Sequence, residues 1–314
     1  MKILLLGRNG QVGWELQRAL APLGELIALD RHSQIDATQP DGNTVVLCGD
    51  LSNIDGIRAT IATVKPDIVV NAAAYTAVDK AESAAQDADI INHLAVQAMA
   101  NACQQIGALL VHYSTDYVFN GQGTQARAET DDTDPLNIYG KTKRAGELAI
   151  LASGCNALIF RTSWVYATRG HNFIKTMLRL AQERDELSII NDQMGAPTSA
   201  ALIADVTAHA LKTYVNAQAP AQLCGIYHLT TAGSVSWYDY AQFVFKHAIP
   251  LGYTLKIKQV KPIETSAYPT PAQRPLNSRL SLAKLEQQFG LTPPHWQQGV
   301  LHTLQEIIEG KTEK

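Results

Sequence analysis

The sequence predicts an α/β protein in which a Rossmann-type, doubly wound parallel sheet carries a smaller C-terminal α/β substrate lobe. Three observations lead to this prediction. Short apolar segments alternate with helical segments through the first half of the chain, which is the pattern of repeated βαβ units. The first apolar segment runs straight into a glycine-rich turn that begins at Gly7. The pair Tyr139 and Lys143 follows far downstream.

Six apolar segments of the first half have the length of strands that are buried on both faces. They are Lys2–Leu6, Leu26–Asp30, Val45–Cys48, Asp67–Asn71, Leu109–Tyr113 and Ala157–Phe160. Amphipathic helices are expected between them, at Gln11–Leu20, Ile54–Val64, Ala88–Ile106 and Tyr139–Leu151. The stretch Ser33–Thr44 is rich in proline, glycine, aspartate and asparagine, so we expect a surface turn there.

The alternation becomes less regular after Thr162. Helices are expected at Phe173–Glu183, Leu202–Tyr214, Trp237–Lys246 and Trp296–Glu309. Short strands are expected at Leu187–Ile190, Tyr227–Leu229 and Leu255–Lys258, with a long loop at Thr265–Pro275. We therefore expect residues 1–162 to form an NAD(P)-binding Rossmann domain. Residues 163–314 should form mainly the substrate lobe, with some segments returning to the first domain.

Composition and charge narrow the class of protein. The chain has 314 residues, of which 46% are hydrophobic and 18% charged, and a net charge of −3. This balance favours neither a nucleic acid nor a membrane surface as a partner. The apolar run after Met1 is too short for a signal peptide, and no segment is long enough to span a bilayer. Because the four cysteines are widely scattered, we expect no structural disulfides and a cytoplasmic location.

The glycine-rich turn predicts a dinucleotide-binding site. Gly7, Gly10 and Gly13 are spaced as G-x-x-G-x-x-G, with Gln11 opening the first helix and Val12 following it. Glycine is needed where the backbone turns tightly and approaches a pyrophosphate with no Cβ in the way. The N–H groups at the start of the helix then face the phosphates. We therefore expect these five residues to bind NADPH or NADH.

The end of the second strand bears on which of the two cofactors is used. Asp30 lies where an acidic residue accepts hydrogen bonds from the adenosine ribose in NAD enzymes. Arg8 and Arg31 are placed to neutralise a 2′-phosphate instead, so the two signals conflict. Taken together, the acidic residue and the two arginines favour NADPH as the cofactor, with some tolerance of NADH. Asp50 and Leu51, after the third strand, are expected to flank the adenine.

A run of small residues follows the fourth strand. Asn71 is followed by three alanines that end at Ala74. Side chains this small let the backbone lie against a bound cofactor, and they suit the close packing of a helix on a sheet equally well. The sequence leaves both interpretations open.

Tyr139 and Lys143 are the predicted catalytic pair. They are four residues apart, so on a helix their side chains lie on one face, one turn apart. An ammonium beside a phenol lowers the pKa of the phenol and makes tyrosine a better proton donor near neutral pH. A hydroxyl near the end of the fifth strand should complete the group, and Thr115 is favoured over Ser114. We expect a bound ketone to receive a hydride from the nicotinamide while Tyr139 protonates its oxygen.

With these residues, the chain resembles the dTDP-4-dehydrorhamnose reductases, a family of extended short-chain dehydrogenase/reductases, over nearly its whole length. The resemblance rests on Gly7–Glu15, Thr76–Glu82, Ser114–Phe119, Tyr139–Lys143, Arg161–Tyr166, Gly195–Thr198 and Arg274–Ser278. It implies reduction of dTDP-4-dehydro-L-rhamnose to dTDP-L-rhamnose. It also implies a cofactor site formed by Gly10, Gln11, Val12, Asp30, Asp50, Leu51, Ala74, Tyr75, Thr76, Tyr113, Tyr139 and Lys143.

The resemblance also implies which residues contact the nucleotide-sugar substrate. Thr115, Asp116 and Trp164 would touch it, with the indole of Trp164 as an aromatic wall. A tryptophan at a strand end is often simply part of a core. Arg274 would pair with the diphosphate, and its alternative is a salt bridge at the surface.

One departure from the family concerns metal binding. Some members join two subunits through a divalent cation that is held by glutamates on the first helix and on two C-terminal segments. Glu15 matches the first of these glutamates, but Ala201 and Gln297 stand at the later positions. A hard cation needs several carboxylate oxygens, so we expect no metal site and leave open whether a homodimer forms. The stretch Ser33–Thr44 also looks longer than is usual in the family.

Three other functions remain open on the sequence alone. A reductase of another nucleotide 4-keto-6-deoxysugar would share the same chemistry and differ in product stereochemistry. A non-catalytic regulatory subunit would be expected to have lost Tyr139 or Lys143, and both are present. An epimerase or dehydratase of nucleotide sugars shares the fold, because fold alone does not fix function.

Overall fold

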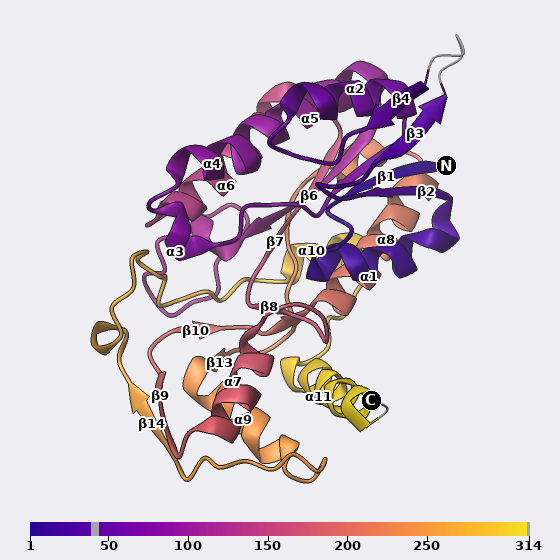
Figure 1. Cartoon of the computed structure of the whole chain (residues 1–314). Coiled ribbons are helices and arrows are strands. Elements are labelled where there is room, and N and C mark those ends of the chain that lie inside the picture. The colour runs from indigo at the N-terminus through magenta and orange to yellow at the C-terminus, as the bar shows by residue number, and fades with distance from the viewer. Residues whose placement is uncertain (39–43, 313–314) are drawn as a thin grey trace.

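The computed structural model describes residues 1–38 and 44–312, and six of the strands in these residues form one parallel sheet (Figure 1). The strand order is β12-β7-β6-β5-β1-β2. The strands are β1 Lys2–Leu6, β2 Glu25–Leu29, β5 Ile68–Asn71, β6 Leu109–Thr115, β7 Ala157–Thr162 and β12 Gly225–His228. The chain leaves β1 to one side for β2 and later fills the other side from β5 outward. This order is doubly wound, so the predicted fold class is confirmed.

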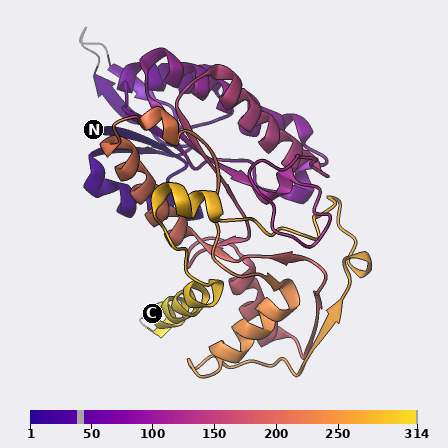
Figure 2. The same cartoon turned by 180° about the vertical axis from the view of Figure 1, so that it is seen from behind.

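Helices cover both faces of the sheet, as opposite views show (Figures 1 and 2). One face packs on α1 Gln11–Leu20, α8 Ala200–Asn216 and α10 Ala283–Phe289. The other packs on α2 Ile54–Val64, α5 Ala95–Ile106 and α6 Ile138–Ser153. The side chains from Ile3 to Leu6 are fully buried between the two layers. A strand covered on both faces must be apolar throughout, which explains the unbroken apolar run in the sequence.

The helix predicted at Ala88–Ile106 lies within one unbroken helical run that starts three residues earlier. The run consists of α4 Ala85–Asp89, a π-helical turn at Ile90–Leu94 and α5 Ala95–Ile106, and the short helix α3 Val78–Ala81 precedes it. A π-helical turn is rare and is often found near functional sites. Here it places Asn92, a buried residue, beneath the loop that follows β5.

The predicted third strand of the main sheet is wrong. Residues Thr44–Leu47 form β4, which pairs antiparallel with β3 at Ile35–Thr38 in a separate two-stranded sheet. The side chain of Val46 is 56% exposed, so this strand is not buried on both faces as its apolar sequence suggested. The predicted surface turn at Ser33–Thr44 therefore contains a strand, and its residues 39–43 lie outside the described part of the chain.

The smaller lobe has a core of its own, rich in aromatic residues. Its larger elements are α7 Phe173–Glu183, β9 Glu186–Ile190, α9 Trp237–Ala248, β14 Gln259–Ile263 and α11 Trp296–Thr312. Four two-residue strands complete it, β8 Val165–Tyr166, β10 Met194–Gly195, β11 Thr198–Ser199 and β13 Val235–Ser236. The strand predicted at Leu255–Lys258 is wrong, because the segment that pairs with β9 is β14, directly after it.

Parts of the second half of the chain belong to the main sheet. β12 pairs in parallel with β7 at the sheet edge, and α8 and α10 pack on the same face as α1. The division at residue 162 remains a prediction, but these contacts show that both halves of the chain build the sheet. The four cysteines are unpaired. No helix in residues 1–38 and 44–312 is long and apolar enough to cross a membrane.

Candidate active site

A cleft of about 750 Å³ opens at the carboxyl ends of the parallel strands. Its walls come from the segments after β1, β2, β5 and β6, from helix α6, and from the residues that follow β7. Loops that leave neighbouring strands diverge at this edge of a doubly wound sheet, which is why ligands bind there.

Most of the residues predicted to bind the cofactor and the substrate line this cleft. They are Gly7, Gly10, Gln11, Val12, Asp30, Arg31, Asp50, Leu51, Ala74, Thr76, Tyr113, Thr115, Asp116, Tyr139, Lys143 and Trp164. Gly13, Tyr75 and Arg274 lie outside its lining. Gly13 is buried in the first turn of α1, where a Cβ would lie 2.1 Å from the carbonyl oxygen of Gly7. Its position therefore serves the packing of the turn.

The glycine turn has the shape that a pyrophosphate needs. Gly7 has a φ of +87°, and a Cβ on it would lie 2.7 Å from the backbone nitrogen of Ala73. Helix α1 starts directly behind the turn. Its N-cap residue, Gly10, has no side chain that could accept a hydrogen bond from the first helical N–H groups. These N–H groups and the positive end of the helix dipole are therefore available to an anion. Both features fit a dinucleotide cofactor.

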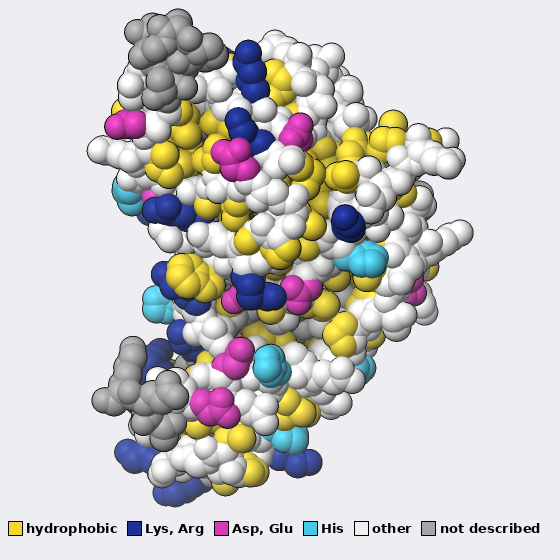
Figure 3. Space-filling view, turned by 90° about the vertical axis from the view of Figure 1, so that its right-hand side faces the viewer, with side chains coloured by type: hydrophobic (Ala, Val, Ile, Leu, Met, Phe, Trp, Pro, Cys, Tyr) yellow, Lys and Arg dark blue, Asp and Glu magenta, His cyan; other side chains and the backbone are white. Residues whose placement is uncertain are grey.

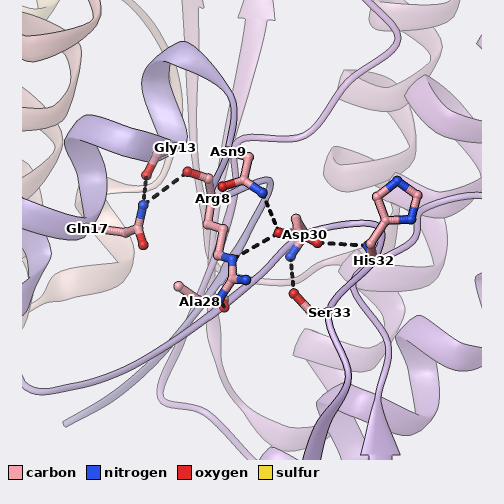
Figure 4. A network of polar contacts seen from close by, with 8 residues as sticks. All are labelled: Arg8, Asn9, Gly13, Gln17, Ala28, Asp30, His32 and Ser33. Atoms are coloured by element: carbon pink, nitrogen blue, oxygen red, sulfur yellow. Dashed lines mark hydrogen bonds and ion pairs between the residues drawn. The ribbon is translucent and has the colours of Figure 1, made fainter. Parts of the chain in front are cut away.

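Asp30 is the centre of a hydrogen-bond network at the end of β2 (Figure 4). Its carboxylate accepts hydrogen bonds from Arg8 Nε at 3.0 Å, from the Asn9 amide and from the His32 N–H at 2.8 Å. Burial acts to raise the pKa of Asp30, but the hydrogen bonds from His32, Arg8 and Ser33 and the positive charge of Arg8 outweigh burial and lower it. An acid and a base thus lie paired at this end of the cleft, so the conflict seen in the sequence between NADH and NADPH has a structural counterpart.

Helix α6 presents Tyr139 and Lys143 to the cleft. The helix starts where Asn137 Oδ1 accepts a hydrogen bond from the Gly140 N–H at 2.8 Å, which fixes its first turn at Tyr139. Gly140 also lets the helix pack closely on the segment after β6. A Cβ there would lie 2.3 Å from the carbonyl oxygen of Tyr117.

Tyr139 and Thr115 lie together in the cleft lining, and the two side chains interact. Burial raises the pKa of Tyr139 to about 12, a hydrogen bond with Thr115 acts to lower it, and the Asp116 carboxylate acts to raise it. Thr115 Oγ1 itself donates to Asp116 Oδ1 at 3.0 Å. Tyr139 is therefore protonated near neutral pH, which is the form that a proton donor needs.

Asp116 is a buried carboxyl group in the cleft wall. Burial raises its pKa to about 6, against the effect of hydrogen bonds from Ser278 and Thr115. Its Oδ2 is buried without a hydrogen bond of good geometry to the described residues. Such an oxygen is costly unless a ligand or water satisfies it. Asp116 is therefore suited to accept a hydrogen bond from a polar ligand.

Lys143 is buried, and its side chain reaches the end of β6. Nζ donates to the carbonyl oxygen of Tyr113 at 2.6 Å and lies 3.1 Å from His112 Nε2. Burial lowers the pKa of Lys143 to about 8, and the carboxylate of Glu147, one turn farther along α6, acts to raise it. The pKa of Tyr139 is shifted by burial, by Thr115 and by Asp116. In this arrangement Lys143 contacts mainly the end of β6.

Trp164 belongs both to the cleft wall and to the lobe core. Its ring stacks on Trp237 with the ring centroids 3.4 Å apart and the planes at 10°. The backbone of Trp164 has a φ of +48°, an unusual value for a bulky residue. Gly195 makes room for it, because a Cβ there would lie 2.5 Å from the indole. Trp164 therefore packs on the lobe core and also lines the cleft, and its contact with a substrate stays a prediction.

Arg274 pairs with Asp79, which lies at the start of α3. Its two terminal nitrogens lie 3.1 Å and 2.8 Å from the two carboxylate oxygens. This fork geometry is the strong form of an arginine–carboxylate pair. The arrangement is the salt bridge that the sequence offered as the alternative for Arg274. To contact a diphosphate in the cleft, the guanidinium would have to leave Asp79.

The hydrogen-bonding roles of several polar residues that shape the site were not predicted from the sequence. Asn92 Oδ1 accepts a hydrogen bond from the Tyr75 N–H at 2.9 Å, and its Nδ2 donates to the Tyr75 carbonyl at 3.1 Å and to Thr142 at 3.2 Å. His112 and Asn71 are neighbours on β6 and β5 behind Lys143. The available signal for these two was a polar residue at the end of a buried strand. The π-helical turn around Asn92 has no comparable signal.

The positions matched to the metal-binding glutamates lie on three helices, Glu15 on α1, Ala201 on α8 and Gln297 on α11. On the face shown in Figure 3, acidic and basic side chains are interspersed with hydrophobic ones. Glu15 Oε2 lies 3.9 Å from Arg18 Nε. In the described part of the chain, no group of three or more His, Cys, Asp and Glu side chains is arranged to hold a metal ion.

Comparison with known sequences identifies close relatives. The family model of the RmlD substrate binding domain matches residues 1–309. A dTDP-4-dehydrorhamnose reductase of Escherichia coli K12 is 53% identical over 308 residues, which cover 98% of each protein. The dTDP-4-dehydrorhamnose reductase of Salmonella typhimurium LT2 is 52% identical over 312 residues, 99% of this chain and 100% of the relative. These matches confirm the resemblance drawn from the sequence.

Solved structures agree with the sequence relatives. A dTDP-4-dehydrorhamnose reductase from Bacillus anthracis in complex with NADP matches with a TM-score of 0.84 and 33% identity, covering 97% of this chain and 99% of that one. A Clostridium acetobutylicum orthologue matches with a TM-score of 0.83 and 35% identity, covering 99% and 100%. A UDP-glucose 4-epimerase from Thermus thermophilus is 19% identical at a TM-score of 0.76, a likeness of fold alone.

Proposed function

The chain belongs to the family of the RmlD substrate binding domain, and from that premise we propose that it is an oxidoreductase that converts dTDP-4-dehydro-L-rhamnose to dTDP-L-rhamnose with NADPH or NADH. Relatives that match nearly their full length carry the name of this reductase, and one solved relative holds NADP. The proposed reaction reduces the C4 ketone of the sugar.

One observation carries the chemical part of the proposal. A protonated, half-buried tyrosine and a threonine hydroxyl lie together in the lining of a cleft behind a glycine turn that suits a dinucleotide. When bound, the reduced nicotinamide supplies the hydride for the ketone carbon. Tyr139 then delivers a proton to the ketone oxygen, and the Thr115 hydroxyl, once it turns from Asp116 to the substrate, donates a hydrogen bond to that oxygen as negative charge grows on it.

The remaining residues of the cleft divide between cofactor and substrate. Lys143 would hold the nicotinamide ribose and, as an ammonium, stabilise the Tyr139 phenolate after proton transfer. Asp116 would accept a hydrogen bond from the sugar nucleotide through its unsatisfied oxygen. Trp164 would provide a flat wall for the deoxysugar or the thymine. Arg274 would reach the diphosphate only after it separates from Asp79.

The proposal is tested with the purified protein, NADPH or NADH, and enzymatically prepared dTDP-4-dehydro-L-rhamnose. The absorbance of the reduced nicotinamide is followed, and the product is identified by NMR. We expect oxidation of the cofactor and dTDP-L-rhamnose as the product. Formation of the C4 epimer would support the proposed reduction and change the identity of the product. If the cofactor binds but is not oxidised, the proposal that the protein is this reductase is rejected.

A further inference from the structure

Three buried polar side chains form a line behind the cleft. Asn71, at the end of β5, lies opposite His112 in the parallel register with β6. Asn71 Nδ2 lies 3.2 Å from His112 Nδ1, and His112 Nε2 lies 3.1 Å from Lys143 Nζ. The side chains are almost completely shielded from solvent, with exposed fractions of 1% for Asn71, 0% for His112 and 2% for Lys143. Bulk solvent therefore barely reaches these side chains, and their polar atoms depend on neighbouring groups of the protein and, for Lys143, on the cleft.

The backbone fixes which way the Asn71 amide points. Its Oδ1 accepts a hydrogen bond from the Ala73 N–H at 3.1 Å. If the amide were turned over, its NH₂ would face that N–H, donor against donor. The Ala73 nitrogen cannot move away easily, because it is packed against the glycine turn, where even a Cβ on Gly7 would lie 2.7 Å from it. Oxygen therefore faces Ala73, and Nδ2 faces His112.

This orientation decides which ring nitrogen of His112 carries a proton. Nδ2 of Asn71 is a donor, so His112 Nδ1 must accept and carries no proton. Burial and the neighbouring Lys143 lower the pKa of His112 well below its usual value, so the ring is neutral. A neutral imidazole has one N–H, and here it is on Nε2, which faces Lys143 Nζ.

We propose that Asn71 holds His112 as the Nε2–H tautomer, and that this N–H makes His112 a positioning residue that turns the Lys143 ammonium toward the cleft. The inference rests on the proposed function in one respect, since it concerns the lysine assigned there to the cofactor ribose and the Tyr139 phenolate. The tautomer itself depends only on the contacts of Asn71.

The two protonation states of Lys143 fit this environment differently. A neutral amine accepts from His112 Nε2–H and donates to the Tyr113 carbonyl oxygen, which lies 2.6 Å away. An ammonium has only donors, so Nε2–H opposes it and only the Tyr113 carbonyl remains on this side. Because a buried ammonium needs further acceptors, its remaining N–H groups must turn to the cleft. Ribose hydroxyls and a tyrosine phenolate are acceptors of that kind.

Other charged groups near Lys143 do not remove this preference. Glu147, on the same helix, is the carboxylate that acts on Lys143. Its oxygens already accept hydrogen bonds from Arg161 and Arg144. On the cleft side, the Asp116 carboxylate raises the pKa of Tyr139 and accepts a hydrogen bond from the Thr115 hydroxyl. The side chain that faces Nζ directly from the neighbouring strand is therefore His112, beside the Tyr113 carbonyl.

The tautomer is measured directly by a long-range ¹H–¹⁵N correlation spectrum of the histidine rings in the ¹⁵N-labelled full chain. The His112 signals are identified by their loss in His112→Gln. We expect the proton on Nε2 across neutral pH. In Asn71→Asp, the carboxylate can accept from both Ala73 N–H and an Nδ1–H, so the proton should move to Nδ1. A wild-type ring that is protonated on Nδ1 or on both nitrogens would overturn the inference.

Asn92→Asp is the matched control, because it also places a carboxylate at a buried amide beside α6, yet Asn92 bonds Tyr75 and Thr142 instead of His112. Its His112 tautomer should stay as in the wild type. If Asn71→Asp does not fold, Asn71→Ala removes the donor to Nδ1 and should give a mixture of tautomers. An unchanged, pure Nε2–H tautomer in the folded Asn71 variant would reject the role of Asn71.

The positioning role has a separate readout in the pH dependence of kcat/KM. In Asn71→Asp, the Lys143 ammonium gains an acceptor at His112 Nε2 and a nearby negative charge, so the pKa of Lys143 rises. The loss of activity at alkaline pH should then move upward by about one pH unit, and kcat should fall because the ammonium is held away from the cleft. An unmoved alkaline limb in a variant with the inverted tautomer would overturn the positioning role. A wild-type protein without reductase activity but with the expected tautomer would reject the proposed function alone.

Discussion

The carboxylate of Glu147 accepts two hydrogen bonds from the guanidinium of Arg161, at 2.8 Å and 2.7 Å, and both side chains are buried. Glu147 lies on α6, one turn beyond Lys143, and Arg161 lies near the end of β7. The pair therefore ties the helix that carries Tyr139 to the sheet edge that carries the cleft.

Loss of one partner of this pair should be costly. In Glu147→Gln, the Arg161 guanidinium remains buried without its counter-charge, so the free energy of unfolding should fall by about 3–5 kcal/mol. Denaturant unfolding followed by circular dichroism measures the change. The control is Arg18→Ala, because Arg18 and its partner Asp205 are 62% and 58% exposed. That exposed pair should be worth less than about 1 kcal/mol, and equal losses in the two variants would contradict this account.

Asp116 should destabilise the fold as pH rises. Its pKa is raised to about 6 in the folded protein from the ordinary value of 3.8. The folded state thus binds the proton more tightly than the unfolded state, and its stability contribution, complete below the ordinary pKa, is lost as pH rises through about 6. Asp116→Asn should therefore be more stable than the wild type at pH 8, by up to about 3 kcal/mol, and similar to it at pH 4.

Unfolding curves of the wild type and Asp116→Asn at the two pH values provide the measurement. A constant difference between the two proteins would rule out the raised pKa. Turnover should fall in the same variant, because the residue loses the carboxylate proposed to accept a hydrogen bond from the substrate.

The network around Asp30 should set the preference between the two cofactors. In Asp30→Ala, Arg8 loses its partner at 3.0 Å and is free to meet a 2′-phosphate, while the adenosine ribose loses a carboxylate acceptor. The ratio of kcat/KM for NADPH to that for NADH should rise about tenfold, the effect of one charged hydrogen bond. Arg8→Ala is the opposing variant and should lower the ratio. A shift in the same direction in both variants would contradict the assignment of this network to the adenosine end.

Removal of divalent metal should leave the protein unchanged. The positions matched to metal-binding glutamates include Ala201 and Gln297, which cannot act as anionic ligands. We expect the same turnover and the same sedimentation coefficient before and after treatment with a chelator. Recovery of activity or of a dimer on addition of Mg²⁺ would show that a metal site exists.

The predicted site residues that the structure brings into one cleft are those set by local geometry. The glycine turn at Gly7 and the spacing of Tyr139 and Lys143 depend on a few consecutive residues, so their approach to one cleft follows once a parallel sheet is inferred. The alternation of strands and helices gives the fold class for the same reason. Val45–Cys48 shows the limit of this reasoning. Its apolar composition suits a buried strand, but only tertiary pairing with β3 decides that it lies outside the main sheet.

The parts that could not be predicted depend on residues far apart in the chain. Arg274 meets Asp79 across 195 positions, and nothing in either local sequence indicates the other. The contact between Lys143 and His112 requires the exact rotation of α6 over the end of β6. The π-helical turn that carries Asn92 depends on packing beneath the loop after β5. In each case, tertiary contacts select one geometry among several that the local sequence allows.

In the proposed reaction, Tyr139 gives a proton to the ketone oxygen while the ketone carbon receives the hydride. The most direct measurement compares turnover of dTDP-4-dehydro-L-rhamnose and binding of NADPH in the wild type and in Tyr139→Phe. The variant keeps the ring and its packing and loses only the hydroxyl, so we expect NADPH to bind with nearly the wild-type Kd and turnover to fall at least about 100-fold. Turnover close to that of the wild type in this variant would contradict the claim.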